Sequence, residues 1–600
     1  YLFVPLALAV VFALLVSFVL ARTLVPTMAM YLLRPHDPAA GEHPSDNAFV
    51  RFQRGFDRQF ERLRARYGEA LKQLLGIRRK FAVIVLAAMT LSLALVPLLG
   101  RDFFPAVDAG QIALHVRTPA GTRIEESSVT FAKVQQRIRE VLPAGEIETV
   151  VDNIGISLAP LNNIYANSGT VGPNEGDILI TLADGHAPTE EHVRTLRREL
   201  PLSFPGVDFA FLPADMTSQI LNFGSPAPID IQIRGRNIPE NQQYAQKLLK
   251  RLRLIPGLAD ARIQQSTRYP QLNVEVDRSR IAQYGLTQRD VTASLGTALA
   301  GTSQSAPVFY LNPENGVSYP VVAQIPERDV SSLTDLAALP VVGAVGAEPQ
   351  TLGGIGRITR GNTMSVVSKY DIQPVINIYA STQGRDLGAV AADVNAAIAE
   401  LENERPEAAS VTLRGQYETM NIAFTGLAFG LLAAIVLIYL VIVVNFQTWV
   451  DPLVIIGALP AALAGIAWML FLTGTTLSVP ALIGAIMAMG VSTANAILVV
   501  SFARERLAET GDATKAALEA GLVRLRPVLM TALVMIISMA PMALGLGEGA
   551  EQNAPLGRAV IGGLAFATVA TLFLVPALFA LAHRKGAPKV RSIEWEPSHA

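Results

Sequence analysis

Seven long apolar segments alternate with polar and charged stretches along the chain. Each is at least as long as the roughly 20 residues that a helix needs to cross a bilayer, so each predicts a membrane span. They lie at 4–33, 81–100, 421–445, 452–473, 477–502, 526–547 and 556–582. Residues 101–420, between the second and third segments, follow a different pattern and are expected to form a separate domain.

Lysine and arginine cluster in three of the stretches that flank the apolar segments. They occur in the connection 34–80, in the loop 503–526 and in the tail 583–600. If the segments cross the membrane in alternation, all three stretches lie on one side, which the positive-inside rule identifies as the cytoplasm. The insert 101–420 is therefore expected outside, and 421–582 is expected to form five spans.

The connection 34–80 contains an amphipathic helix pattern over 48–75. Its apolar residues recur at a spacing of three and four, and five arginines lie between them. The apolar positions are Phe49, Phe52, Phe56, Phe60, Leu63, Tyr67, Leu71 and Leu74. This pattern predicts a helix that lies on the inner membrane surface, and the alternative is a soluble helix packed against another domain.

The insert alternates between strand and helix patterns. The strand-like segments IALHVRT and IETVVDNIG flank one helix pattern, and IDIQIRG, ARIQQS and QLNVEVD accompany a second. A third β-α-β unit begins with VINIYAS and ends with ASVTLRGQY, whereas 276–364 is richer in Gly, Pro and short strands. The pattern predicts several small α+β subdomains, with one inserted into another.

Composition agrees with a membrane protein and excludes several kinds of chemistry. The chain is 51% hydrophobic and 16% charged, and its net charge of -1 offers no basic surface for nucleic acid. It contains no cysteine, which excludes disulfides and thiolate chemistry. Because no phosphate-binding loop, GxSxG or HExxH motif occurs, we expect no catalytic residues, no cofactor and no metal, and an ion gradient as the energy source.

Two similar sequences end the first and the last apolar segments. LVPTMAM occupies 24–30 and LVPALFA occupies 574–580, and basic residues follow each. The pair predicts a repeat architecture in which 1–33 ends one repeat and the remainder forms a second. The alternative is a chance similarity, since Leu, Val, Ala and Pro are common in this chain. The chain starts at Tyr1, without a basic region before its apolar run, so this run is not predicted to be a signal peptide, and we expect the chain to be a fragment.

Four blocks near the C-terminus occur in an order and spacing that resemble a known family. They are NFQTWVDPLVIIGALP, GVSTANAILVVSFARERL, VRLRPVLMTALVMIISMAPMALG and GGLAFATVATLFLVPALF, and they resemble the last five spans of resistance-nodulation-division (RND) efflux permeases. FFPAVDAGQIALHVRTPAGTRIEES and PQLNVEVDRSRIAQYGLTQRDVTASLGTALAG resemble segments of the outer domain of that family. The chain is similar to the C-terminal portion of the acriflavine-resistance type, which exports drugs and hydrophobic compounds.

The resemblance implies a helical transmembrane bundle, with seven spans here, and a large periplasmic α+β domain of ferredoxin-like porter subdomains with an inserted docking subdomain. On that template, 106–200 is one porter subdomain, 225–275 with 365–418 is another, and 276–364 is the docking subdomain. It further implies a trimer, of this chain alone or mixed with a related permease, in the Gram-negative inner membrane. The implied partners are a periplasmic adaptor, an outer-membrane channel and the lipid bilayer.

The polar residues Ser492, Thr493 and Asn495 interrupt an apolar segment and form a candidate proton relay. In the drug-exporting branch, a lysine usually precedes this asparagine and pairs with buried carboxylates, but here the position is Ala494. Thr531 resembles a hydroxyl that the family places beside the relay. The alternative is that these small polar side chains hold packed helices together.

Arg22 is a candidate replacement for the missing lysine. It lies about 18 Å along the helix from Arg34, at ~1.5 Å per residue, which is deep in the bilayer. Pro26 leaves the Arg22 carbonyl without its helical hydrogen bond, and a buried cation beside a loosened turn suggests a function. The alternative is that Arg22 extends to the membrane surface or makes a structural pair.

The substrate is less clear from the sequence. In drug exporters a Phe-lined loop corresponds to 154–172, but here Ile154, Gly155 and Ile156 begin it, and Leu179 replaces a common pocket Phe. The alternative is that this loop is a scaffold. We therefore predict export of hydrophobic or amphiphilic compounds by proton antiport, with a non-coupling structural subunit or a periplasmic scaffold as the main alternative.

Metal export ranks lower on the sequence alone. Metal-exporting relatives use methionines in the outer cleft, but Met216, Met364 and Met420 form no close pair in this sequence. The histidines of the insert, at 115, 186 and 192, are also widely separated. Because soft metals need such ligands close together, the residues favour an organic substrate.

Overall fold

The computed structural model describes residues 4–32, 48–156, 169–170, 172–222, 225–303, 307–343, 348–547 and 549–584. The chain divides into two compact units, Tyr1–Ala70 and Leu71–Ala600. Among the described residues, seven helices are long and apolar enough to cross a membrane, which confirms the predicted number.

Unit 1 contains helices α1 (Val4–Arg22) and α2 (Leu24–Leu32) and most of α3 (Ala48–Gly76). The first predicted span is therefore two helices, separated at Thr23. Pro26 has no N–H to donate to the Arg22 carbonyl, which explains the interruption. The Thr23 hydroxyl donates instead to the Val19 carbonyl at 2.7 Å, and Thr27 donates to the Thr23 carbonyl at 2.8 Å. Helix α3 forms where the amphipathic pattern predicted it.

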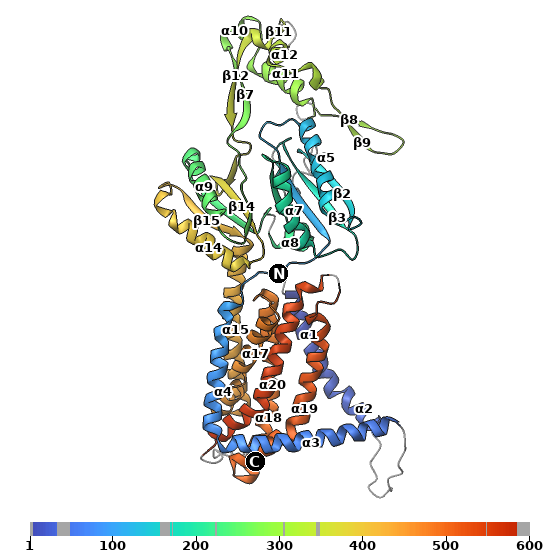
Figure 1. The fold of residues 1–600 in the computed structure, drawn as a ribbon, viewed down its shortest axis with the longest axis vertical. Coiled ribbons are helices and arrows are strands. Elements are labelled where there is room, and N and C mark those ends of the chain that lie inside the picture. The colour runs from blue at the N-terminus through green and yellow to red at the C-terminus, as the bar shows by residue number, and fades with distance from the viewer. Residues whose placement is uncertain are drawn as a thin grey trace, which may run out of the picture. The chain divides into compact units, whose positions relative to one another are not determined.

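The remaining apolar helices form a bundle in unit 2, coloured from orange to red with α4 in blue in Figure 1. They are α4 (Arg78–Ser92) with η1 (Leu93–Leu98), α15 (Gln416–Phe446), α16 (Val450–Ile456) with α17 (Leu459–Leu472), α18 (Val479–Thr510), α19 (Ala513–Ala543) and α20 (Ala554–Ala582). The short η4 (Ala550–Gln552) precedes α20. Buried alanine, glycine and leucine side chains line most of α20, as expected for a helix at the centre of a bundle.

The basic stretch 503–526 was predicted to be a loop, but it is mostly helical. Helices α18 and α19 extend through it, and only Gly511 and Asp512 lie between them. Gly511 adopts a left-handed conformation with φ of 68°, and the Asp512 carboxylate accepts a hydrogen bond from the Thr514 amide. The charged residues lowered the hydropathy of this stretch, but its alanines are buried against neighbouring helices, so the helices continue beyond the apolar segments.

Two glycines allow α17 and α20 to approach each other closely. A Cβ at Gly562 would overlap the Met469 side chain and lie 2.6 Å from the Gly465 carbonyl oxygen. We expect Gly562→Ala to destabilise the bundle by about 1–3 kcal/mol, because overpacking shifts helices or side chains. The measurement is thermal unfolding of the protein in detergent. The control is Gly490→Ala, because a Cβ at this position meets nothing within 4 Å. This variant is expected to be neutral or slightly stabilising. Equal losses of stability for both variants would contradict the close approach of α17 and α20 as the cause.

The first sheet of the insert has the strand order β2-β3-β1-β4. Its elements are β1 (Gln111–Arg117), α5 (Ile124–Val141), β2 (Ile147–Ile154), β3 (Glu175–Leu182), α7 (Thr189–Ser203) and β4 (Asp208–Leu212), followed by α8 (Met216–Leu221). Apolar residues of α5 and α7 share one core with β1 and β3. The chain order and strand order together form the split β-α-β arrangement, with β3 between the two strands that α5 connects.

The second sheet repeats this arrangement with a long insertion. It contains β5 (Ile229–Arg234), α9 (Ile238–Leu252), β6 (Leu258–Ile263), β13 (Ser368–Tyr370), β14 (Gln373–Thr382), α14 (Leu387–Glu400), η3 (Glu402–Glu404) and β15 (Ser410–Gly415). Strand β14 pairs with β5 and β6, and β5 pairs with β15. Helix α15 then begins at Gln416 without a loop, so this sheet continues directly into a membrane-length helix (Figure 1).

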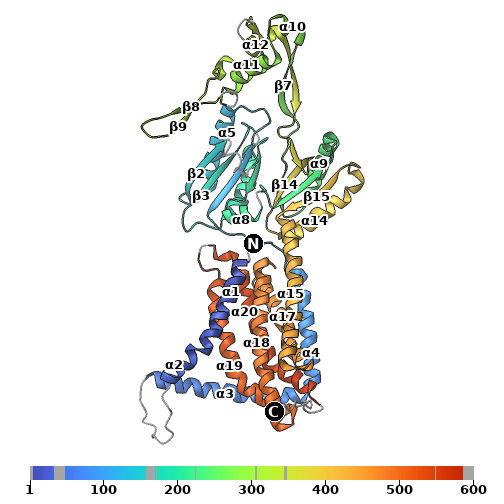
Figure 2. The ribbon, with the colours of Figure 1, turned by 180° about the vertical axis from the view of Figure 1, so that it is seen from behind.

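The insertion between β6 and β14 has its own small core. Its elements are β7 (Tyr269–Val276), α10 (Arg278–Gln283), α11 (Gln288–Ala300), β8 (Val308–Leu311), β9 (Ser318–Val321), η2 (Glu327–Asp329), α12 (Leu333–Ala338), β10 (Pro340–Val341), β11 (Gln350–Thr351), α13 (Leu352–Ile355) and β12 (Gly356–Thr363). Figure 2 shows the β8–β9 hairpin extending from this region. The segment QLNVEVD was grouped with the second β-α-β unit, but β7 pairs only with β12 among the described strands. A strand alternation does not reveal its partner, which explains the difference.

Candidate functional site

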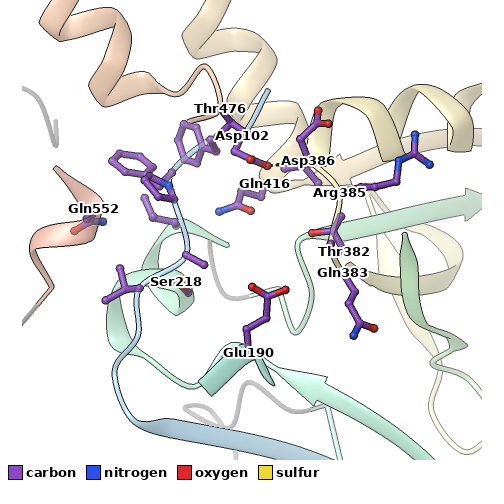
Figure 3. Close-up of a pocket in the computed structure, with 18 of the residues that line it drawn as sticks. Asp102, Glu190, Ser218, Thr382, Gln383, Arg385, Asp386, Gln416, Thr476 and Gln552 are labelled. Carbon is purple, nitrogen blue, oxygen red and sulfur yellow. Dashed lines mark hydrogen bonds between the residues drawn. The ribbon is translucent and has the colours of Figure 1, made fainter. Parts of the chain in front are cut away.

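A cavity of about 700 Å³ lies where the segment after α4 meets α7, α14 and the loop before α18. Figure 3 shows Asp102 and Asp386 on one side of it and Glu190 on the opposite side. Phe103 and Phe104 supply an aromatic wall, with ring centroids 4.9 Å apart in an edge-to-face arrangement. The cavity therefore combines apolar surface with a few polar groups, as binding sites for organic molecules do.

The segment 100–103 is held between the bundle and helix α14. The Asp102 carboxylate accepts a hydrogen bond from the Leu387 amide at 2.8 Å, and the Asp386 carboxylate accepts one from the Arg101 amide at 2.8 Å. On the other side, the Asp102 amide donates to the Leu477 carbonyl at 3.1 Å. The two carboxylates thus connect the N-terminus of α14 to the end of the span that precedes Gly100.

Burial raises the pKa of Asp102, although hydrogen bonds from the Leu387 amide and the Thr476 side chain oppose this effect. The nearby Asp386 carboxylate adds to the increase in the pKa of Asp102. Since the folded state therefore binds this proton more tightly than an unfolded chain, ionisation of Asp102 opposes folding as pH rises through its titration range. The hydrogen bond from the Leu387 amide itself favours the ionised carboxylate, so burial and the Asp386 charge, and not this connection to α14, raise the pKa of Asp102.

The cations around the cavity are already paired. Arg197 makes a two-point ion pair with Asp260, at 3.0 and 2.6 Å, and Arg385 contacts Asp393 at 3.0 Å. No group of three or more His, Cys, Asp or Glu side chains placed to hold a metal ion occurs within the described ranges. The cavity fits an organic molecule better than an isolated cation, because the described residues around it lack the grouped ligands that a divalent cation needs.

The predicted relay residues partly come together in the structure. The Thr531 hydroxyl of α19 donates to the Asn495 side-chain oxygen of α18 at 3.0 Å. Thr493 donates to the Met489 carbonyl at 2.9 Å, and the buried Ser492 hydroxyl has no hydrogen-bond partner in the described part of the chain. Ala494 lies on the exposed side of the same helix. Helix α18 therefore places the side-chain amide of Asn495 beside α19. The neighbouring residue, Ala494, carries no charge.

Arg22 lies in unit 1 and the other relay candidates lie in unit 2, so their pairing stays a prediction. Within unit 1, the guanidinium of Arg22 lies over the Phe18 ring, 5.8 Å from its centroid. This contact at a spacing of four residues is local to α1 and agrees with either reading of Arg22.

The substrate-cleft candidates lie at the edge of the first sheet. Ile154 ends β2, Gly155 has a φ of 80°, and Ile156 and Leu179 are about half exposed. Leu179 pairs with Val151 and Ala113 across the sheet. Residues 157–168 and 171 of the predicted loop lie outside the described residues. Leu179 and Ile156 are nevertheless accessible from outside the core of the sheet.

Sequence reasoning did not identify several polar residues that the structure buries. Asp451 is fully buried at the start of α16, where its carboxylate lies 3.2 Å from His583 Nε2 and 3.6 Å from Arg504 Nη1. The Thr448 hydroxyl donates to the same carboxylate at 2.6 Å. The available signal was an acidic residue within the apolar block NFQTWVDPLVII, but the positions of its partners, far along the chain, were not in the sequence pattern.

Comparisons with known proteins agree with the fold. A sequence model of the AcrB/AcrD/AcrF family matches residues 1–583. The cobalt-zinc-cadmium resistance protein CzcA of Cupriavidus metallidurans is 28% identical over 594 residues, covering 97% of this chain and 53% of CzcA. The nickel-cobalt-cadmium resistance protein NccA of Alcaligenes xylosoxydans xylosoxydans is 29% identical, covering 97% of this chain and 52% of NccA. The chain spans about half the length of the curated relatives that it matches.

A solved structure shows the same architecture. The crystal structure of a heavy metal efflux pump, crystal form II, superposes with a TM-score of 0.74 at 26% sequence identity. The superposition covers 88% of this chain and 53% of that pump. The names of all three similar proteins refer to metals. The sequence had favoured an organic substrate over a metal ion.

Proposed function

Because the chain belongs to the AcrB/AcrD/AcrF family, which confirms its resemblance to RND permeases, we propose that it forms the C-terminal half of an inner-membrane efflux permease. The permease exports amphiphilic organic compounds by proton antiport. The cavity beside Phe103 and Phe104 carries this proposal, because it joins an aromatic wall to polar groups at the end of a membrane-length helix. An amphiphile needs both kinds of surface.

Two features support coupling between the bundle and the outer domain. Segment 100–103 ties α14 to the loop before α18, and α15 continues from β15 without a break. Movement of α15 or α18 in the bundle therefore acts on the second sheet, to which α14 and β15 belong. The bond between Thr531 and Asn495 and the buried Ser492 hydroxyl provide polar groups for a proton path. Ala494 supplies no cation, so a non-coupling structural subunit is the alternative role.

Metal-ion export is the second candidate function. It is favoured by the metal-resistance names of CzcA and NccA and by the heavy metal efflux pump structure. The absence of cysteine argues against a soft-metal path through this chain. The described carboxylates around the cavity also lack the grouping that a divalent cation requires.

The proposed assembly follows from the family rather than from contacts within this chain. We place the permease in the Gram-negative inner membrane, with the domain that contains β1–β15 on the periplasmic side. The working pump is a trimer, of this chain alone or with a related permease, together with a periplasmic adaptor and an outer-membrane channel.

Transport separates these candidates. The permease is expressed from its complete gene, with its adaptor and channel, in a Gram-negative host that lacks its own efflux pumps. We expect cellular accumulation of the fluorescent amphiphile N-phenylnaphthylamine to fall several-fold and to recover when the proton gradient is collapsed. Accumulation of Co²⁺, Zn²⁺ and Cd²⁺ is expected to stay unchanged.

A matched pair of variants tests the cavity itself. Phe104→Ala is expected to reduce dye export several-fold because it removes aromatic surface from the cavity, whereas Phe429→Ala, on the exposed face of α15, is the control.

For the unmodified permease, lower metal accumulation with unchanged dye accumulation would favour the second candidate, metal-ion export. Unchanged accumulation of both dye and metals would favour the structural-subunit role.

A further inference from the structure

A second cavity, of about 270 Å³, lies between the two sheets of the outer domain. Four arginines line it, together with only two carboxylates, so the lining carries a surplus of two positive charges. The arginines are Arg117, Arg253, Arg262 and Arg268, and the carboxylates are Glu175 and Asp208. Positive charge that lines a cleft attracts anions and repels free divalent cations.

Arg262 of β6 is the buried member of this set. It is 7% exposed, and its Nε and Nη2 atoms have no hydrogen-bond partner within the described ranges. Its guanidinium lies 5.7 Å from the centre of the Tyr379 ring. Burial, together with the charge of Arg117, lowers the pKa of Arg262 to about 10, so it remains a cation at neutral pH. A buried cation with open donor atoms is costly unless something pairs with it.

The two carboxylates that act on the charge of Arg262, Glu175 and Asp260, are engaged by other cations. Glu175 lies 2.6 Å from Arg117 Nε, and Arg117 also donates to the carbonyls of Ile263 and Gln264. Asp260 makes its two-point pair with Arg197. These carboxylates partly compensate the charge of Arg262 across a distance, but neither accepts a hydrogen bond from its Nε or Nη2 atom. These two donor atoms of Arg262 thus stay available to a ligand in the cavity.

The same cavity also contains buried acceptors. The side-chain oxygens of Asn174 and Gln242 line it without a hydrogen-bond partner, and these residues are 3% and 8% exposed. A ligand that satisfies the whole lining therefore presents an oxyanion to Arg262 and a hydroxyl or ammonium group to the amides. Arg253 and Arg268 are exposed and add positive charge at the rim.

We propose that this cleft binds the oxyanion of the exported compound, a phosphate or a carboxylate, with Arg262 as its buried anchor. The proposal rests on the proposed export function and adds anionic amphiphiles to its substrates. Arg262 determines the affinity for the anionic headgroup, because its fork of N–H donors matches an oxyanion with two hydrogen bonds. An oxyanion in the cleft also supplies the counter-charge that the burial of Arg262 demands.

Calorimetry with the permease, purified in a neutral detergent from its complete gene, tests the proposal. The probes are octyl phosphate, octyltrimethylammonium and octanol, each below its micelle concentration, and inorganic phosphate. Octyl phosphate is expected to bind most tightly among the octyl compounds. Arg262→Met is expected to weaken that binding roughly ten- to hundredfold, since a hydrogen bond to a charged group is lost. Arg262→Lys is expected to retain part of the affinity.

Two controls keep the result interpretable. Arg236→Met removes an exposed arginine outside the cleft and is expected to leave binding unchanged. Arg262→Met is expected to unfold at the same or a higher temperature, because it removes a buried charge; if it fails to fold, Arg253→Met, at the rim, is expected to weaken octyl phosphate binding in a salt-dependent manner.

The outcomes separate the source of the anion from the proposal itself. If octyl phosphate binds and inorganic phosphate does not, the ligand of the cleft is the anionic headgroup of an amphiphile. If inorganic phosphate binds equally well, the ligand is a free oxyanion. Equal affinity for the three octyl compounds, or unchanged binding in Arg262→Met and Arg253→Met, overturns the proposal. Neither of these results affects export of the neutral dye N-phenylnaphthylamine, whose absence in the unmodified permease would instead contradict the proposed function.

Discussion

Asp260→Ala is expected to destabilise the outer domain by about 3–5 kcal/mol, because it removes a buried carboxylate that pairs with a half-buried arginine and accepts two further hydrogen bonds. The Asp260 side chain is 3% exposed and pairs with Arg197 through two hydrogen bonds. It also accepts hydrogen bonds from the Phe211 amide at 3.2 Å and from the Ser381 hydroxyl at 2.8 Å. One carboxylate therefore joins α7 and β4 of the first sheet to β6 and β14 of the second.

The backbone adds to this effect. Asp260 has a φ of 55°, a left-handed conformation that aspartate tolerates better than alanine does. The test is thermal unfolding combined with hydrogen exchange of the amides in β4 and β6. Asp260→Asn retains an acceptor and is expected to show an intermediate loss, whereas Asp184→Ala, at an exposed position, is expected to stay within about 0.5 kcal/mol. A loss for Asp260→Ala no larger than that for Asp184→Ala would show that the two sheets do not depend on this carboxylate.

Asp451→Ala is expected to have the second largest effect, within the bundle. Removing the carboxylate leaves His583, which is 7% exposed, and Arg504 without their shared partner. We expect a loss of about 2–3 kcal/mol, less than for a fully buried pair, because Arg504 is partly solvated. Arg504 also donates to the Phe446 carbonyl at 2.6 Å, which limits the loss further. Unfolding in detergent is the measurement.

The matched control for Asp451 is an exposed ion pair on a neighbouring helix end. Glu509 pairs with Arg506 at 2.5 Å, but both side chains are well exposed. Glu509→Ala is expected to change stability by less than about 1 kcal/mol, since exposed pairs contribute little. Similar losses for Asp451→Ala and Glu509→Ala would mean that the buried cluster does not hold α16, α18 and the end of α20 together.

The roles of Asp260 and Asp451 could not be predicted from the periodicity of the sequence. Asp260 and Asp451 are single carboxylates in apolar surroundings, and each gains its role from partners that are distant in sequence, such as Arg197 and His583. Arg262 similarly stands within a strand whose alternation is unremarkable, and only the packing of two sheets shows that its donors are unpaired. The meeting of Asn495 and Thr531 was expected from the family resemblance and is present as a hydrogen bond.

The sequence by itself determined the number of membrane-length helices, the alternating strands and helices of the insert, the amphipathic α3 and the family. These features follow from local periodicity and from runs of apolar residues, which depend on each segment alone. The tertiary structure decided that β7 pairs with β12, that α18 and α19 extend through a charged stretch, and that two cavities lie beside the sheets. Strand partners, burial of charge and cavities depend on which distant surfaces meet, and no single segment encodes that information.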